Sequence, residues 1–274
     1  MPWSTLLLAS LALAAPAGQP APDADFEAIV RGVADRTHDA SCAAMEEWIA
    51  GHAGTPEAAR GLLWMARLRR MDQRDDRARP LLDRALVVGK GTTWELPALK
   101  EIADIEAAHR HYGSAIETYD RLAGEKDAFW STVGRLAATD ARAARGRWTL
   151  CCCLLLALVA LGGTRLALAA RAGRRPWVIP REAIFAAPLA LLLLFQAYLQ
   201  PPAEAHAVAA LTLGGFALLW ILGVSVRGQA LTVKRRIAEI ALGACQTAAL
   251  FFCALAGNDL WVKFIDTLTM GAGE

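Results

Sequence analysis

The sequence predicts an all-α protein in which a helical soluble domain is followed by a four-helix transmembrane bundle. Apolar residues recur at helical spacings of three and four through the first half of the chain, and no strand-like alternation interrupts them. Of the 274 residues, 55% are apolar and the mean hydropathy is +0.31. These apolar residues concentrate in residues 149–257, whereas residues 18–148 hold most of the charge. The composition therefore divides the chain into a soluble part and a membrane part.

The first residues are typical of a secretory signal. The apolar run at residues 6–15 is shorter than the ~20 residues that cross a bilayer. Ala15, Pro16 and Ala17 then form a small-residue cleavage site. We expect a signal peptide at 1–17, a Pro-rich linker at 18–24 and an exported helical domain at 25–146. The alternatives are an uncleaved anchor or a buried helix.

Three stretches of the helical domain share a small residue, a bulky residue four positions later, and a small or apolar residue three further on. The triplets are Ala44, Trp48 and Gly51; Ala78, Leu82 and Ala85; and Ala115, Tyr119 and Leu122. They are separated by 34 and then 37 residues. A helical stretch precedes each triplet and carries a small residue twelve positions upstream: Gly32, Ala66 and Ala103. Small residues on both helices let a helical pair approach closely.

This pattern resembles the tetratricopeptide repeat, a helix–turn–helix unit of about 34 residues. The resemblance covers about 25–127 and is best at 96–123, where Tyr112 and Gly113 form the turn. The tryptophan that the family often places near the start of a unit is absent, and Leu62 and Leu99 stand there.

A last amphipathic helix is expected to cap the stack, since a terminal repeat has no following neighbour. It spans 127–146, and its apolar residues are Phe129, Trp130, Val133, Leu136 and Ala137.

The resemblance implies a curved array whose first helices line a face that binds an extended peptide or a partner helix. The residues that it places on that face are Arg60, Leu63, Arg67, Arg70, Lys100 and Asp104. Three of them, Arg60, Arg67 and Lys100, predict a basic groove for an acidic segment or a terminal carboxylate. The asparagines of the family's carboxylate clamp are missing. The alternative is a solvated charged face.

Four apolar segments predict the membrane bundle, at 149–170, 183–200, 205–226 and 237–257. The first and third connecting loops are rich in Arg and Lys, and the second has neither. The positive-inside rule places the basic loops in the cytoplasm. The N-terminal domain and the C-terminal tail at 258–274 are then periplasmic, and the tail forms an amphipathic helix in the outer interface.

Charged residues within the membrane segments are Arg165, Glu182 and Glu239, all near the cytoplasmic ends. We expect structural pairing and snorkelling there, with Glu239 paired to Arg165 or Arg236. Gln246 is the only strongly polar side chain near the middle of its segment. Small residues in these segments allow the membrane helices to pack closely, and they also allow copies of the chain to associate through these helices.

No motif predicts catalysis, a cofactor or a metal site. His109 and His111 are two residues apart, so they point to different sides of a helix and cannot chelate one ion. The consecutive cysteines Cys151, Cys152 and Cys153 likewise cannot converge on one ion. With a net charge of +2 and no basic stripe, the chain has no nucleic-acid signature.

These features predict a non-enzymatic scaffold of the bacterial inner membrane. Its periplasmic array would bind another envelope protein or peptide, and its other partner would be the lipid bilayer. The alternative function is a small transporter or channel subunit with an outer regulatory domain. An intramembrane enzyme is disfavoured, because no paired titratable groups share one depth.

Overall fold

The computed structural model describes residues 24–35, 37–175, 178, 180–227 and 232–270. All regular structure among these residues is helical, which confirms the all-α prediction for the described part. The chain forms two compact units, Met1–Arg142 and Ala143–Glu274, and each is described by itself. The signal peptide at 1–17 and nearly all of the linker lie outside the described residues.

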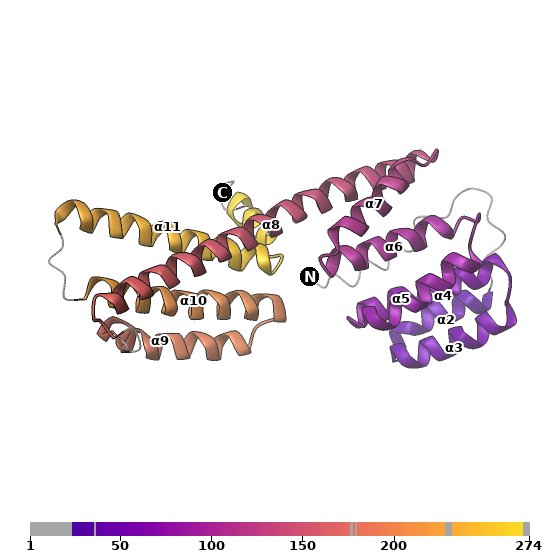
Figure 1. The fold of residues 1–274 in the computed structure, drawn as a ribbon. Coiled ribbons are helices and arrows are strands. Elements are labelled where there is room, and N and C mark those ends of the chain that lie inside the picture. The colour runs from indigo at the N-terminus through magenta and orange to yellow at the C-terminus, as the bar shows by residue number, and fades with distance from the viewer. Residues whose placement is uncertain (1–23, 36, 176–177, 179, 228–231, 271–274) are drawn as a thin grey trace. The chain divides into compact units, whose positions relative to one another are not determined.

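The N-terminal unit is a series of helices joined by short loops. Its helices are α2 (Ala24–Arg31), the 3-10 helix η1 (Gly32–Asp35), α3 (His38–Gly51), α4 (Pro56–Met71), α5 (Asp75–Val88), α6 (Glu95–Ala108), α7 (Tyr112–Ala123) and the first part of α8 (Ala128–Arg171). From α2 to α7, each helix packs against the next one in the chain (Figure 1). Short connections make such neighbours antiparallel, so the unit is an array of helical hairpins.

The loops of this array repeat with a period of 37 residues. Gly54 and Gly91 have left-handed backbone angles, with φ of 81° and 74°. Gln73 and Arg110, in the turns that follow α4 and α6, have φ of 58° and 64°. In both turns, the next backbone amide donates to the carbonyl five residues back, at 2.9 Å and 2.8 Å. This is the helix-terminating arrangement in which a left-handed residue lets the orphan carbonyls find donors.

The buried seams of the second helices follow the same period. In α5 and α7 the predicted triplets are buried, each residue at most 4% exposed: Ala78, Leu82, Ala85, Ala115, Tyr119 and Leu122. The triplet predicted for α3 is wrong by three residues. Ala44 is half-buried and Gly51 is exposed, whereas Ser41 and Met45 are fully buried and Trp48 is 7% exposed. With Ser41 in place of Ala44, the separations become 37 and 37 residues.

The small residues predicted on the first helix of each unit are buried in two of the three units. Ala66 and Ala103 are fully buried, as the close approach of paired helices requires. Gly32 is half-buried and belongs to η1, so the first unit has no regular helix at that position.

The start of α8 packs against the array through only part of the expected face, because Trp130 and Ala137 contact the core whereas other expected residues do not. The buried residues there are the small ones, Gly134, Ala138 and Ala141, which follow each other by four and three positions. Phe129 and Leu136, expected to cap the stack, are 59% and 63% exposed. The reason is space, because α8 lies close to the backbone of α7 and only small residues fit between them.

The second unit contains the rest of α8, α9 (Arg181–Tyr198), α10 (Pro202–Val226), α11 (Val233–Gly257) and α12 (Trp261–Met270). Three described helices are long and apolar enough to cross a membrane, namely α8, α10 and α11. This agrees with a multi-pass membrane protein. The segment expected at 183–200 forms α9, whose apolar part, Ala183–Tyr198, is shorter. A fourth crossing stays a prediction.

Glycines bring the membrane helices together. A Cβ on Gly162 of α8 would lie 2.9 Å from Ile221 Cδ1 of α10, and one on Gly214 of α10 would lie 2.6 Å from Leu250 Cδ1 of α11. Both contacts are shorter than van der Waals distance, so each glycine admits a large side chain from the facing helix. Two edge-to-face ring pairs join α12 to α11: Trp261 with Phe252, and Phe264 with Phe251.

Candidate functional site

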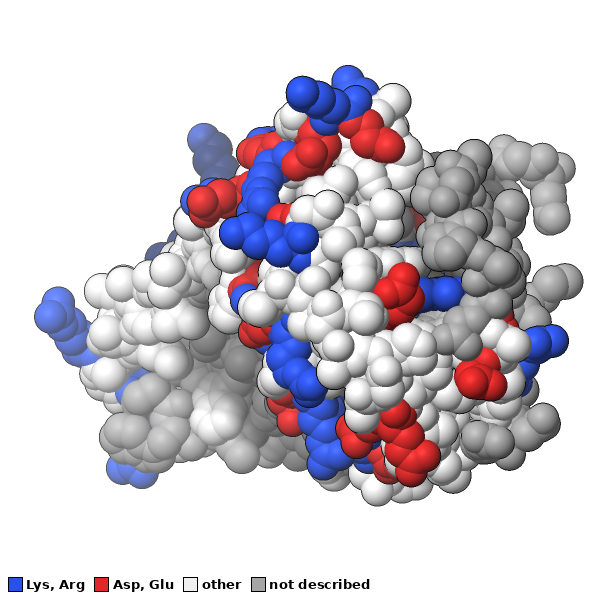
Figure 2. Space-filling model, turned by 90° about the vertical axis from the view of Figure 1, so that its right-hand side faces the viewer, with Lys and Arg blue, Asp and Glu red and all other residues white. Residues whose placement is uncertain are grey.

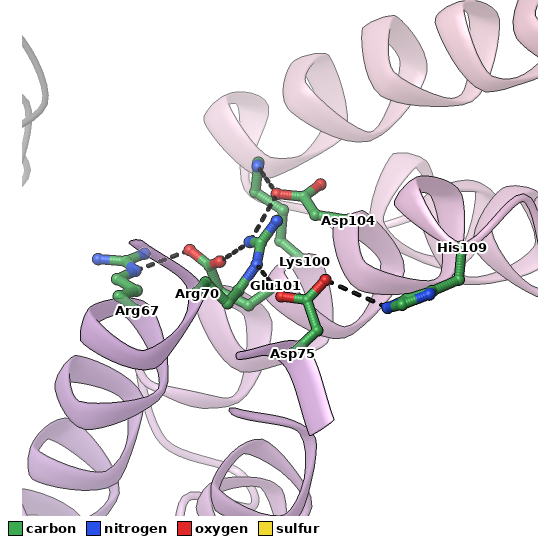
Figure 3. A network of polar contacts seen from close by, with 7 residues as sticks. All are labelled: Arg67, Arg70, Asp75, Lys100, Glu101, Asp104 and His109. Atoms are coloured by element: carbon green, nitrogen blue, oxygen red, sulfur yellow. Dashed lines mark hydrogen bonds and ion pairs between the residues drawn. The ribbon is translucent and has the colours of Figure 1, made fainter. Parts of the chain in front are cut away.

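A cluster of charged side chains joins α4, α5 and α6, and it contains four of the six residues expected in the binding face (Figure 3). The four are Arg67, Arg70, Lys100 and Asp104. Arg67 and Arg70 are three residues apart on α4, and Lys100 and Asp104 are four apart on α6, so each pair shares one helix face. Glu101, Asp75 and His109 complete the cluster, which we call the α4–α6 network.

Glu101 is the carboxylate at the centre of the α4–α6 network. Only 8% of the residue is exposed. Its Oε1 accepts a hydrogen bond from Arg67 Nε at 2.7 Å, and its Oε2 accepts one from Arg70 Nη1. Two guanidinium groups on one carboxylate offset the cost of burying its charge.

Asp104 links the network to the second helix of its hairpin. Its Oδ2 accepts from Lys100 Nζ at 2.6 Å and lies 3.6 Å from Arg70 Nη1. Its Oδ1 accepts from the hydroxyl of Tyr119 at 2.6 Å. Burial, and then the hydrogen bond to Asp104, raise the pKa of Tyr119 well above its usual range. The phenol therefore remains a protonated donor at physiological pH.

Arg70 bridges the carboxylates of the network. Besides Glu101 and Asp104, its Nε lies 3.8 Å from Asp75 Oδ1. This Nε is buried and makes no hydrogen bond with the described residues. Asp75 in turn lies 3.2 Å from His109 Nε2. His109, which follows the last residue of α6, thus faces a carboxylate of the preceding hairpin.

The α4–α6 network is balanced in charge, with three cations against three carboxylates when His109 is neutral. The cations expected in a basic groove are therefore paired with carboxylates: Arg67 and Arg70 contact Glu101, and Lys100 contacts Asp104. A basic groove at these residues stays a prediction. Figure 2 shows one face of the molecule on which Lys and Arg side chains lie beside Asp and Glu side chains, with uncharged surface between them. Sequence reasoning missed Glu101 and Asp75. Glu101 lies 34 residues after Arg67, but that spacing does not show whether its carboxylate faces solvent or the neighbouring hairpin.

The other two expected groove residues lie elsewhere. Arg60 donates to Glu27 Oε1 at 2.9 Å, and its guanidinium carbon lies 3.8 Å from the ring centre of Phe26. The ring of Trp94 is 5.7 Å away. Arg60 therefore fastens α4 to α2. Leu63 is 3% exposed and belongs to the core, so it does not line an open surface.

In the second unit, Arg165 of α8 and Glu239 of α11 form an ion pair. Their side chains are 11% and 22% exposed. This is one of the two pairings that the sequence left open for Glu239. The side chain of Glu182, in α9, lies outside the described residues. A paired charge at a helix–helix contact avoids leaving an uncompensated ion in the membrane.

Groups of three His, Cys, Asp or Glu side chains able to hold a metal ion do not occur among the described residues. His109 and His111 have ring centres 6.5 Å apart and contact different carboxylates, Asp75 and Glu106.

The chain matches no protein-family model, no curated protein and no solved structure.

Proposed function

We propose that the protein is a bacterial inner-membrane scaffold whose periplasmic helical array, of the tetratricopeptide-like kind, binds another envelope protein or peptide. The observation that carries this proposal is the 37-residue repeat of helical hairpins, with its recurring loop geometry and buried seams. Stacked hairpins present an extended surface made of equivalent helices, which is how repeat proteins bind partners.

The α4–α6 network is the best candidate for the contact surface. Arg67 and Lys100 keep 35% and 33% of their side chains exposed. Each already has a carboxylate partner, so the surface offers positions of both signs in a fixed geometry. A partner that carries both acidic and basic side chains would complement it, and wrong partners would meet like charges.

The periplasmic location rests on the distribution of charge. One basic loop lies between α8 and α9 and the other between α10 and α11. Of these helices, α8, α10 and α11 are long and apolar enough to span a membrane, and the two loops share one side only if α9 crosses as well. If those loops are cytoplasmic, the array and the tail face the periplasm. A cleaved signal peptide at 1–17 would export the array to the same side.

Affinity capture after in-cell crosslinking tests this function. The full chain is compared with Arg67→Glu/Lys100→Glu and with the matched control Arg77→Glu/Arg84→Glu, whose arginines are exposed on α5. We expect the first variant to lose a discrete crosslinked envelope protein and the control to keep it. Removal of residues 25–146 should abolish capture. An unchanged set of crosslinked proteins in that deletion would contradict the scaffold.

One observation favours the alternative of a transporter or channel subunit. Gln246 in α11 is 6% exposed, and its Nε2 is buried without a hydrogen bond to any described residue. A buried polar group without a partner within a membrane helix is costly and often functional. Ion or solute flux in proteoliposomes that is lost in Gln246→Leu would support this second function.

A further inference from the structure

A pocket opens where the loop after α8 meets the end of α10. Its volume is about 410 Å³, within the range of small-ligand pockets. The lining residues are Gly173, Arg174, Arg175, Val178, Pro180, Val224 and Arg227. Three arginines and four residues without charge thus share one cavity.

Arg174 builds the wall of this pocket. Its Nη1 donates to the carbonyl oxygen of Ser225 and lies 3.5 Å from that of Val224. Both carbonyls belong to the last turn of α10, where they lack partners within the helix. Arg174 therefore holds the loop against the end of α10, and a cation there also suits the negative end of the helix dipole.

The other two arginines supply charge that no described neighbour balances. Arg175 and Arg227 are exposed and form no ion pair with the described residues. Residues 166–238 contain only two acidic residues, Glu182 and Glu204, against eight Lys and Arg. Glu204 is paired with Lys263 of α12. This part of the chain therefore has a strong positive excess.

The pocket lies at the ends of α8 and α10, both long and apolar enough to cross a membrane. Its uncharged wall includes Val178, which is 37% exposed. We propose that this pocket binds the phosphate of an anionic phospholipid headgroup, with Arg175 and Arg227 as the phosphate ligands and Arg174 as their positioning residue. Basic pockets between membrane helices suit such headgroups, because guanidinium groups bind phosphate oxygens and the apolar wall continues into the acyl region.

Lipid retention by the purified full chain tests this site. The protein is incorporated into nanodiscs of phosphatidylcholine with a minor fraction of phosphatidylglycerol, and the lipids bound to it are measured by native mass spectrometry. The variant Arg175→Gln/Arg227→Gln leaves Arg174 in place, so the fold of the loop is kept. The matched control Arg235→Gln/Arg236→Gln removes the same charge from the start of α11.

We expect phosphatidylglycerol retention to fall about 100-fold in the pocket variant, about ten-fold for each hydrogen bond lost between a guanidinium and the phosphate. Arg175→Lys/Arg227→Lys should retain most of the binding. The control should lose less than about five-fold. Equal losses in pocket variant and control would overturn the site, because they would show only diffuse attraction to an anionic surface.

A second arm distinguishes the source of the phosphate. The detergent-solubilised full chain is titrated with phosphatidylglycerol, phosphatidylcholine or inorganic phosphate, and its melting temperature is measured. Stabilisation by phosphatidylglycerol alone, lost in Arg175→Gln/Arg227→Gln, supports the lipid site. Stabilisation by inorganic phosphate to the same degree supports the phosphate pocket but assigns it to a soluble ligand. No stabilisation by either phosphate-bearing probe would overturn the proposal.

Discussion

Glu106 illustrates how single residues tie one hairpin to the next. Its Oε1 accepts a hydrogen bond from Arg79 of α5, and its Oε2 lies 2.9 Å from His111 Nδ1. The hydrogen bond from Arg79 is the main cause that lowers the pKa of Glu106 below its ordinary value of 4.5, and the contact with His111 lowers it further. The carboxylate is 18% exposed, so these contacts are only partly screened by water.

This shift predicts the acid stability of the array. Because the folded pKa of Glu106 lies below 4.5, its contribution is complete above that pH and is lost as pH falls through the folded value. We expect Glu106→Gln to lower the stability at neutral pH by about 0.5–1 kcal/mol and to flatten the loss of stability below pH 4.5. Thermal unfolding of the variant and the unmodified chain from pH 7 to pH 3 measures both effects on stability. Glu47→Gln, at an exposed position of α3, should behave as the unmodified chain, and an equal effect there would contradict the assignment.

Among the elements, α8 shows how small residues set a helix contact. A Cβ on Gly134 would lie 2.3 Å from the backbone nitrogen of Ala123 and 2.7 Å from the carbonyl oxygen of Tyr119. Backbone atoms cannot move aside as a flexible side chain would. The helix must therefore shift if this position carries any side chain.

We expect Gly134→Ala to destabilise the protein by about 1–3 kcal/mol, although alanine favours helix by up to ~1 kcal/mol. Gly113→Ala in α7, where an added Cβ meets nothing within 4 Å, is the control. That variant should leave stability unchanged or raise it slightly. Melting temperatures of the full chain in detergent give the comparison, and a Gly134→Ala protein as stable as the control would refute the close contact.

A second prediction at this scale concerns the ion pair that joins α8 to α11. Removing one partner leaves the other as an uncompensated charge among apolar helices, which costs about 3–5 kcal/mol in buried pairs. We expect Glu239→Gln and Arg165→Gln each to lower the melting temperature and the yield of folded protein. The double variant Arg165→Gln/Glu239→Gln should lose much less than the sum of the two single losses. Additive losses in this double-mutant cycle would show that the two groups do not stabilise each other.

The buried faces of α7 and α3 show which helix contacts could be predicted from the sequence. The seam of α7 was predictable, because Ala115, Tyr119 and Leu122 are the only set with that spacing and the right sizes. In α3 two sets share Trp48 and both have helical spacing, one starting at Ser41 and the other at Ala44. Only the partner helix decides between them, so a single sequence could not.

In the candidate site, too, only part of the arrangement could be predicted from the sequence. The cations Arg67, Arg70 and Lys100 were predictable as members of one face, since they follow from spacing within α4 and α6. Their neutralisation was not, because a carboxylate such as Glu101 has the same appearance in a sequence whether it faces solvent or a neighbouring hairpin. Burial of Glu101 depends on contact between helices about 30 residues apart.

At the scale of the whole molecule, a helical-repeat unit and a unit with candidate membrane helices share one chain. The proposed function requires that the array and the basic loops lie on opposite sides of the membrane. The scaffold would then meet its partner in the periplasm, while the arginine-lined pocket would meet the cytoplasmic leaflet, which is the leaflet that basic loops favour.

Cysteine labelling tests this arrangement most directly. Gly113→Cys lies at an open position of the array, and Arg235→Cys lies at the exposed start of α11. Spheroplasts are treated with a membrane-impermeant maleimide, and labelling is measured above that of the unmodified chain, whose own cysteines set the background. We predict that Gly113→Cys is labelled in intact spheroplasts and that Arg235→Cys is labelled only after permeabilisation. Labelling of Arg235→Cys in intact spheroplasts, with Gly113→Cys protected, would contradict an exported scaffold.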